Sequence, residues 1–279
     1  MESIKAIAEK YTTVSSSNLT EEEACRLKCD NQNKIKGTLN ESDGYNCTEC
    51  NNNGYIFVPK FTEGYGWQEV AVTCKCNKVR NVLRRLKKSG LQDAINKKFD
   101  TYETDTEWRE KLKGMVLNWL GQDGKWLYIG GATGSGKTHL CVAAMLKLLK
   151  RGREVYYFLW RKDAPKLKSL VNDFEAYDKM MSEVLNVDVL YIDDLFKTGR
   201  TESGARQRPT VADINLAFEI INHRYVTNKV TVITSECTSA ELIDIDQALA
   251  GRIVEKAGQY CVSLKGMDKD WRLKGGTTL

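Results

Sequence analysis

Residues 126–149 read WLYIGGATGSGKTHLCVAAMLKLL, and this stretch decides the fold. The short apolar run at residues 126–129 is typical of a buried parallel strand. A glycine-rich segment follows, and apolar residues then recur at helical spacing from Leu140 to Leu148, before Gly152, a typical helix end. Strand, glycine-rich loop and helix in this order predict an α/β domain with a parallel sheet.

The segment between the strand and the helix has the full pattern G-x-x-x-x-G-K-T of a phosphate-binding loop. Its glycines let backbone N–H groups point at a β-phosphate, with the positive end of the helix dipole behind them. Lys137 would neutralise phosphate oxygens, and the Thr138 hydroxyl would ligate Mg²⁺. An incidental glycine-rich turn is the alternative, but every fixed position and both flanks agree with the motif. The residues expected to bind ATP are Gly131, Ala132, Thr133, Gly134, Ser135, Gly136, Lys137, Thr138 and His139.

The composition is that of an ordinary water-soluble protein. The 279 residues are 42% hydrophobic and 28% charged, and the net charge of +5 permits a nucleic-acid partner without requiring one. The N-terminus has no apolar signal region, and no run of eighteen apolar residues occurs. We therefore expect a cytoplasmic protein without membrane contact, whose nine cysteines are thiols or metal ligands rather than disulfides.

Six of the nine cysteines lie within the first 76 residues. Cys47 and Cys50 form a C-x-x-C knuckle, and Cys74 and Cys76 end an alternating run that is typical of a strand. Residues two apart on a strand face the same way, and residues 55–58 would form the partner strand of a hairpin. Four thiolates from two short elements are typical of a closed structural Zn²⁺ site; free buried cysteines are the alternative.

Two further cysteines, Cys25 and Cys29, lie four residues apart on a helix that Thr20 and Glu23 would open as a capping box. Their shared face could offer extra metal ligands, although packing of the two side chains in the core is the favoured interpretation.

A basic segment from Lys78 to Lys98 marks the expected domain boundary. A solvated helix face or linker would explain it, and so would contact with nucleic-acid phosphates or an acidic partner. The sequence predicts a zinc-binding domain at residues 1–78, a basic linker helix at residues 79–98 and an ATPase domain at residues 99–279.

A second apolar run ends in Asp193 and Asp194, the Walker B arrangement. A parallel strand would carry Asp193 to the carboxyl edge of the sheet, where it can hold Mg²⁺. Asp194 would orient or deprotonate the attacking water. At residues 230–235 another strand has a polar end, where Thr234 and Ser235 either sense the γ-phosphate or only cap the strand.

The remaining elements follow from the same patterns. Further strands are predicted at residues 154–160 and 260–264, and helices at residues 161–185 and 211–225. A charged loop, residues 198–210, separates the Walker B strand from the second of these helices.

The chain resembles the DnaC/DnaI-type AAA+ helicase loaders, especially those of phages and Gram-positive bacteria. The resemblance extends over nearly the whole chain and rests on the cysteine module at residues 47–76 and on Lys88-Ser89-Gly90-Leu91 leading into Phe99-Asp100-Thr101-Tyr102. It also rests on the order GGATGSGKTHL, LYIDDLFK, INHRY, ITSE, GRI. It implies an AAA+ core that works as a homo-oligomer, in a hexameric spiral when bound to a helicase. Only thirteen residues follow Gly266, so no C-terminal helical lid is expected, and ATP would be held mainly between subunits.

The resemblance also implies roles for single residues. Arg252 aligns with an arginine finger that reaches a neighbouring subunit's γ-phosphate, although a surface or ion-paired arginine is the alternative. The predicted catalytic set is Lys137, Asp193, Asp194, Ser235 and Arg252. The region at residues 161–185 corresponds to a helical element that faces single-stranded DNA, with Arg161, Lys162, Lys166 and Lys168 either contacting phosphates or simply solvated.

Two positions depart from the family pattern. Asp194 stands where many AAA+ proteins have glutamate, which implies slow hydrolysis. Glu236 stands where many relatives have asparagine, which leaves the identity of the sensor open.

The function implied by the resemblance is that of an ATP-dependent loader. It would bind a hexameric DnaB-type helicase through the zinc module and basic linker, and place it on single-stranded DNA at replication initiation. One alternative is an IstB-like helper of transposition, which would bind duplex DNA and a transposase; the zinc module argues against it. A small-molecule kinase would need an arginine-bearing lid, for which we find no clear candidate, and a non-hydrolysing adaptor would use ATP only to order a binding surface.

Overall fold

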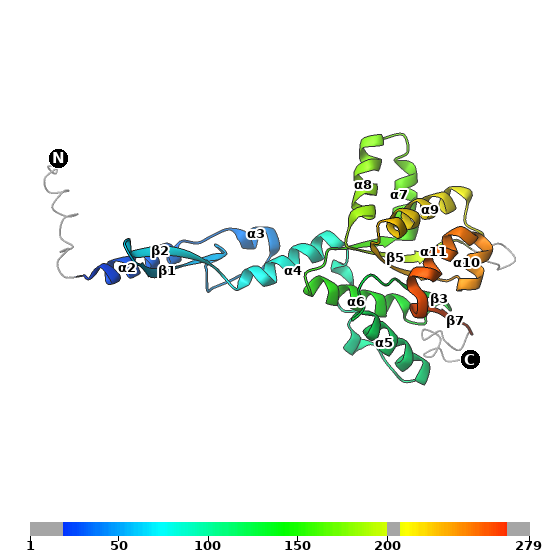
Figure 1. Ribbon diagram of the computed structural model, residues 1–279, viewed down its shortest axis with the longest axis horizontal. Helices are drawn as coiled ribbons and strands as arrows, with labels where there is room; N and C mark the ends of the chain where they lie inside the picture. The colour runs from blue at the N-terminus through cyan, green and yellow to red at the C-terminus, as the bar shows by residue number, and fades with distance from the viewer. Residues whose placement is uncertain (1–18, 200–206, 267–279) are drawn as a thin grey trace, which may run out of the picture. The chain divides into compact units, whose positions relative to one another are not determined.

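The computed structural model describes residues 19–199 and 207–266, which form two compact units divided between Leu83 and Arg84 (Figure 1). The division falls inside helix α4 (Cys76–Ser89). Residues 200–206 of the charged loop lie outside the described residues, and so does the C-terminal tail at residues 267–279. The expected absence of a helical lid depends on this tail.

The first unit is built on a β-hairpin. Strand β1 (Tyr55–Thr62) pairs antiparallel with β2 (Gly66–Thr73), and α2 (Glu21–Lys34) packs against both strands. A short helix, α3 (Leu39–Asp43), precedes the hairpin. The predicted capping box of α2 is confirmed: the Thr20 hydroxyl accepts from the Glu23 backbone N–H, and the Glu23 carboxylate accepts from the Thr20 N–H.

The second unit contains a five-stranded parallel sheet with the order β4-β5-β6-β3-β7, which confirms the predicted fold class. The strands are β3 (Leu127–Gly131), β4 (Val155–Leu159), β5 (Val189–Leu195), β6 (Val230–Ser235) and β7 (Cys261–Leu264). The helices are α5 (Glu107–Trp119), α6 (Lys137–Lys150), α7 (Trp160–Ser169), α8 (Phe174–Asn186), α9 (Val211–Val226), α10 (Ser239–Ile245) and α11 (Gln247–Ala257). Short 3₁₀ turns lie at Gln92–Ala94, Phe99–Thr101 and Gly258–Tyr260.

Both faces of the sheet are buried, because alternate residues of each strand enter two separate cores. Leu127 and Ile129 of β3 pack in one core with residues of α5 and α6. Tyr128, between them, packs in the other core with residues of α7, α8, α9 and α11. A strand covered on both sides needs the continuous apolar run that the sequence shows.

The strand order places the functional segments together. Strand β6 lies between β5 and β3, as expected for a strand whose polar end lies near the metal-binding residues. All three strands are parallel, so the phosphate-binding loop after β3, the aspartates at the end of β5 and the polar end of β6 meet at one edge of the sheet.

Three expectations about local structure are corrected. Strand β2 ends at Thr73 and α4 begins at Cys76, so Cys74 and Cys76 converge from a strand-to-helix turn rather than from one strand. The predicted linker helix at residues 79–98 ends at Ser89, because Gly90 adopts a left-handed conformation with φ +77°. The single helical region at residues 161–185 is two helices, α7 and α8. None of the helices described is long and apolar enough to cross a membrane.

Candidate nucleotide-binding site and cysteine cluster

The phosphate-binding loop joins β3 to α6 and depends on three glycines. Gly131, Gly134 and Gly136 have φ angles of +100°, +69° and +83°, a region that favours glycine. At Gly136 a second reason applies, since a Cβ there would lie 2.7 Å from the ring of Tyr102. The tertiary structure therefore excludes side chains at the place where the backbone must approach a phosphate.

Lys137 lies at the first turn of α6 and points back into the loop. Its side chain is almost fully buried, with the residue 6% exposed, and its Nζ donates to the carbonyl oxygens of Gly131 at 2.9 Å and Ala132 at 2.7 Å. Burial lowers the pKa of Lys137 from its ordinary value, while the nearby carboxylates of Asp194 and Glu236 act in the opposite direction. The loop thus holds the Lys137 ammonium against its own backbone carbonyl groups.

The two predicted magnesium ligands lie side by side. The Thr138 hydroxyl donates to Asp193 Oδ1 at 3.0 Å, and Asp193 is 3% exposed. A hydroxyl and a carboxylate are oxygen ligands of the kind that Mg²⁺ prefers, so these residues fit the ion.

Further hydroxyl groups hold the Asp193 carboxylate, and the sequence analysis missed their role. Tyr157 donates to Oδ2 at 2.8 Å, and Tyr191 and Thr234 donate to Oδ1 at 2.7 Å and 2.5 Å. Burial and the charge of Asp193 raise the pKa of both tyrosines, so they remain donors. Residues two apart on a strand point to the same face, so the spacing of Tyr191 and Asp193 on β5 is a signal in the sequence. Tyr157 is the cross-strand neighbour of Tyr191 on β4.

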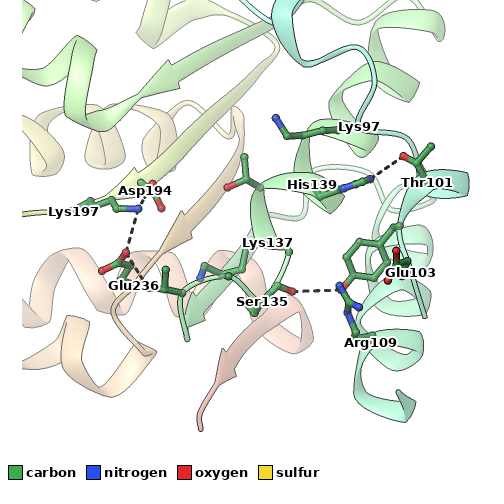
Figure 2. A pocket seen from close by; sticks show the side chains of 15 residues that line it. Lys97, Thr101, Glu103, Arg109, Ser135, Lys137, His139, Asp194, Lys197 and Glu236 are labelled. Carbon is green, nitrogen blue, oxygen red and sulfur yellow. Dashed lines mark hydrogen bonds and ion pairs between the residues drawn. The ribbon is translucent and has the colours of Figure 1, made fainter. Parts of the chain in front are cut away.

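Asp194 is already engaged in an ion pair. Lys197 Nζ lies 2.8 Å from Asp194 Oδ2 and 3.1 Å from Glu236 Oε1, and the Thr133 hydroxyl donates to the same Glu236 oxygen at 3.1 Å. Figure 2 shows this group to one side of Lys137. No pattern in the sequence indicates a role for Lys197.

The structure does not bring Ser235 to the pocket. Ser235 is fully buried, and its hydroxyl donates to the Leu195 carbonyl at 2.7 Å and accepts from the Cys237 backbone N–H at 3.0 Å. The side chain that faces the cavity is the next one, Glu236, while Thr234 bonds Asp193. The expectation for Ser235 is therefore corrected to a role in fixing the ends of β5 and β6.

A cavity of about 440 Å³ extends from the loop to the segment before α5. On this far side Arg109 lies with its guanidinium over the Tyr102 ring at 5.0 Å and its Nη1 2.9 Å from Asp105. His139 Nε2 lies 2.8 Å from the Lys98 carbonyl oxygen, which ties α6 to this segment. The lining residues outside the loop and α6 are Lys97, Thr101, Tyr102, Glu103, Arg109, Asp194, Lys197 and Glu236.

The segment at residues 97–109 was not predicted to line the site. Its one signal in the sequence was Phe99-Asp100-Thr101-Tyr102, which contributed only to the family resemblance. The contact of Tyr102 with Gly136 is made across 34 residues of chain, and no local pattern indicates it.

Arg252 lies on α11, away from the cavity of its own chain. Its Nε donates to Asn222 Oδ1 at 2.9 Å and its Nη1 to the Ala248 carbonyl at 2.9 Å, with the guanidinium 4.9 Å from the Phe218 ring centre. The residue is not among those that line the cavity, so action on a neighbouring subunit's nucleotide stays a prediction.

The basic residues of α7 differ in their surroundings. Arg161, Lys162 and Lys166 are exposed, whereas Lys168 forms an ion pair with Asp213 on α9 at 2.6 Å. Three of the four predicted DNA contacts are therefore accessible, and the fourth is partly engaged within the fold.

In the first unit the four predicted zinc ligands converge. The sulfur atoms of Cys47, Cys50, Cys74 and Cys76 all lie within 4.8 Å of one another, with Cys47–Cys74 at 3.9 Å and Cys50–Cys76 at 3.6 Å. A tetrahedral zinc ion with Zn–S bonds of about 2.3 Å separates its sulfur ligands by about 3.8 Å. The sulfur positions thus fit a Zn²⁺ ion, and this group does not include Cys25 or Cys29.

The surroundings of the cysteine cluster support a charged metal centre. The Gly54 N–H donates to Cys50 Sγ at 3.3 Å, as expected for a thiolate in a zinc knuckle. Arg80, which is 1% exposed, pairs with Asp43 at 2.6 Å and bonds Asn52 at 3.0 Å next to the cluster. The sequence analysis treated Arg80 only as part of a basic segment, because its partners are brought near by the fold.

Comparisons with known proteins agree with this geometry. The family model described as IstB-like ATP binding protein matches residues 72–276. Phage-like element PBSX protein XkdC of Bacillus subtilis (strain 168) is 30% identical over 257 residues, covering 84% of this chain and 90% of that protein. The crystal structure of the DnaC helicase loader has 26% sequence identity and a TM-score of 0.50, covering 62% of this chain and 99% of that one.

A parallel sheet with a complete phosphate-binding loop facing a Walker B aspartate defines a P-loop nucleotide-binding protein with an AAA+ core like that of DnaC. The chain belongs to the IstB-like ATP-binding family. The predicted ATP-binding core and the resemblance to DnaC-type loaders are confirmed at the level of family and fold.

Proposed function

We propose that this protein is an ATPase that loads a DnaB-type hexameric replicative helicase on single-stranded DNA at replication initiation. The observation that carries the proposal is the similarity to the DnaC helicase loader over 99% of that chain, together with a complete nucleotide site. A partial similarity to the chromosomal replication initiator protein DnaA of Porphyromonas gingivalis, 30% identical over 50% of this chain and 28% of that protein, supports the same process.

ATP would bind with its phosphates on the loop. The backbone N–H groups at the start of α6 and the Lys137 ammonium attract the β- and γ-phosphates. Thr138 and Asp193 would hold Mg²⁺, and the ion would supply positive charge that offsets the charge of the phosphates. The adenosine would extend toward Tyr102 and Arg109 on the opposite side of the cavity.

Hydrolysis would use Asp194 as the residue that orients water. The water oxygen forms the new bond to the γ-phosphorus, the bond from that phosphorus to the β–γ bridging oxygen breaks to leave ADP, and Asp194 accepts the water proton. Arg252 of a neighbouring subunit would stabilise the charge on the transferred group. This requirement couples turnover to assembly of a homo-oligomer.

The first unit would bind the helicase. The hairpin and the cysteine cluster make a small module that α4 joins to the ATPase core, and the exposed residues Arg161, Lys162 and Lys166 of α7 would contact DNA phosphates.

The test is native mass spectrometry of the protein mixed with a DnaB-type helicase, with ATP, with ADP and with the Lys137→Ala variant. A defined complex that forms with ATP, without DNA, and is lost with Lys137→Ala is the expected result. If no complex forms under any nucleotide condition, the loader proposal is wrong.

The second candidate is a helper role in DNA transposition, because the family model that matches this chain is described as IstB-like ATP binding protein. This role predicts an ATP-dependent shift of duplex DNA in the absence of any helicase. The same protein preparations, assayed on a labelled duplex, distinguish the two functions.

A further inference from the structure

One cation of the nucleotide cavity, Lys197, has no role in the proposed function. It follows the Walker B strand, lines the nucleotide cavity, and has a side chain that is 23% exposed. Its ammonium lies between two carboxylates, 2.8 Å from Asp194 and 3.1 Å from Glu236 (Figure 2). The cation therefore joins the ends of β5 and β6.

The backbone holds Lys197 in this place through an unusual turn. Asp194 and Phe196 have φ angles of +58° and +57°, a conformation that residues other than glycine rarely adopt. The pairing of β5 with β6 shifts register between Ile192 and Leu195, and the Asp194 N–H donates to the Thr234 hydroxyl at 3.1 Å. Strained backbone that the surroundings maintain is concentrated at functional sites. Here the strain turns both Asp194 and Lys197 toward the cavity.

In the proposed binding mode of ATP, the end of the triphosphate would lie near Lys197. Lys197, Asp194 and Glu236 lie on one side of Lys137, and Arg109 and Thr101 lie on the other side (Figure 2). A nucleotide whose β-phosphate occupies the loop, and whose base extends toward Arg109, directs its γ-phosphate at Lys197. ADP would end before this point.

We propose that Lys197 senses the γ-phosphate and controls Asp194. Without a γ-phosphate, the ammonium stays paired with Asp194 Oδ2 and occupies the carboxylate oxygen that would otherwise accept a hydrogen bond from the attacking water. A γ-phosphate in contact with Lys197 competes for the same cation, releases Asp194 and completes the hydrolytic site. The inference rests on the proposed binding of ATP in this cavity.

The decisive measurement compares affinities for ADP and a non-hydrolysable ATP analogue in the Lys197→Met variant and the unchanged protein. A charge-assisted contact to the γ-phosphate predicts that Lys197→Met weakens binding of the ATP analogue by about tenfold or more. The ADP affinity should stay within about twofold, which also shows that the variant is folded. Lys197→Arg should retain most of the preference for ATP.

Two further variants sharpen the test. Lys97→Met removes another cation that lines the cavity and should change both affinities by the same factor, so that their ratio stays unchanged. Glu236→Gln removes one competitor for Lys197 and should raise that ratio.

The outcomes separate this inference from the proposed function. If Lys197→Met weakens ADP and the ATP analogue equally, Lys197 only supports the structure and the inference is overturned. If the unchanged protein binds both nucleotides equally, there is no γ-phosphate sensing although the ATP site stands. If it binds neither, the proposed nucleotide function itself fails.

Discussion

At the scale of single residues, the site depends on how one carboxylate is held. Asp193 accepts hydrogen bonds from Thr138, Tyr157, Tyr191 and Thr234, so the orientation of this proposed Mg²⁺ ligand is determined by the protein itself. Bonds of this kind behind a metal ligand commonly change metal affinity by an order of magnitude.

Tyr157→Phe removes the donor to Asp193 Oδ2 and leaves the ring in place. We expect the Mg²⁺ concentration for half-maximal ATP binding to rise by about tenfold, because the carboxylate loses one of its constraints. Nucleotide titrations at fixed Mg²⁺ concentrations measure this. Tyr156→Phe is the matched control, since Tyr156 packs against the core on the other face of the sheet. An equal effect of both changes would refute the positioning role.

At the scale of elements, the helices on one face of the sheet are tied together at α9. Asp213 serves both as the third helical residue of the α9 capping box, with Thr210, and as the partner of Lys168 on α7. Its surroundings lower the pKa of Asp213: burial acts to raise it, but the bonds to Lys168 and Thr210 outweigh burial.

Asp213→Asn should lower the free energy of unfolding by about 1–2 kcal/mol at pH 7. A carboxylate with a folded pKa below its ordinary value of 3.8 stabilises the protein above that pH, and the contribution is lost as the pH falls through the folded pKa. The difference between Asp213→Asn and the unchanged protein should therefore decrease as the pH falls below 3.8. Denaturant titrations from pH 7 to about pH 3 follow it. A difference that stays constant with pH would contradict the ionic explanation.

At the scale of the whole molecule, the two units are stabilised differently. The parallel sheet of the second unit lies between two large apolar cores. In the first unit, among residues 19–83, the buried apolar side chains are six cysteines: Cys25, Cys29, Cys47, Cys50, Cys74 and Cys76. A unit this small, whose described residues include no larger buried apolar side chain, typically needs a metal or disulfides for its stability.

Removal of zinc with a strong chelator should therefore unfold the first unit and leave ATP binding intact. The expected zinc content is about one ion per chain, since four thiolates complete one tetrahedral site. Metal analysis and limited proteolysis of the hairpin provide the measurement. Cys50→Ser should reproduce the proteolysis pattern, and a metal-free hairpin that resists the protease would disprove the dependence.

The proposed oligomer makes a prediction about mixtures. Arg252→Ala should bind ATP normally but lose turnover, and Lys137→Ala should lose ATP binding while keeping its arginine. Mixing the two inactive variants should restore measurable ATPase activity, because one supplies an intact nucleotide site and the other an intact Arg252. Activity of Arg252→Ala alone at the unchanged rate would exclude the role in trans. No turnover in any preparation, including the unchanged protein, would favour the adaptor function.

The sequence by itself determined those parts of the protein whose chemistry depends on local spacing. The phosphate-binding loop, the aspartates after an apolar strand and the paired cysteines are short segments in which each residue's role follows from its neighbours, so their assembly was predictable. Only the tertiary structure decided the rest. Tyr157 reaches the site through strand pairing, Lys197 through a strained turn and Arg109 from a distant segment. Ser235 is buried against the end of β5, and Glu236 is the side chain that faces the cavity. The contacts of Tyr157 with Asp193, of Lys197 with Glu236 and of Ser235 with Leu195 join residues far apart in the chain, so no local periodicity encodes them.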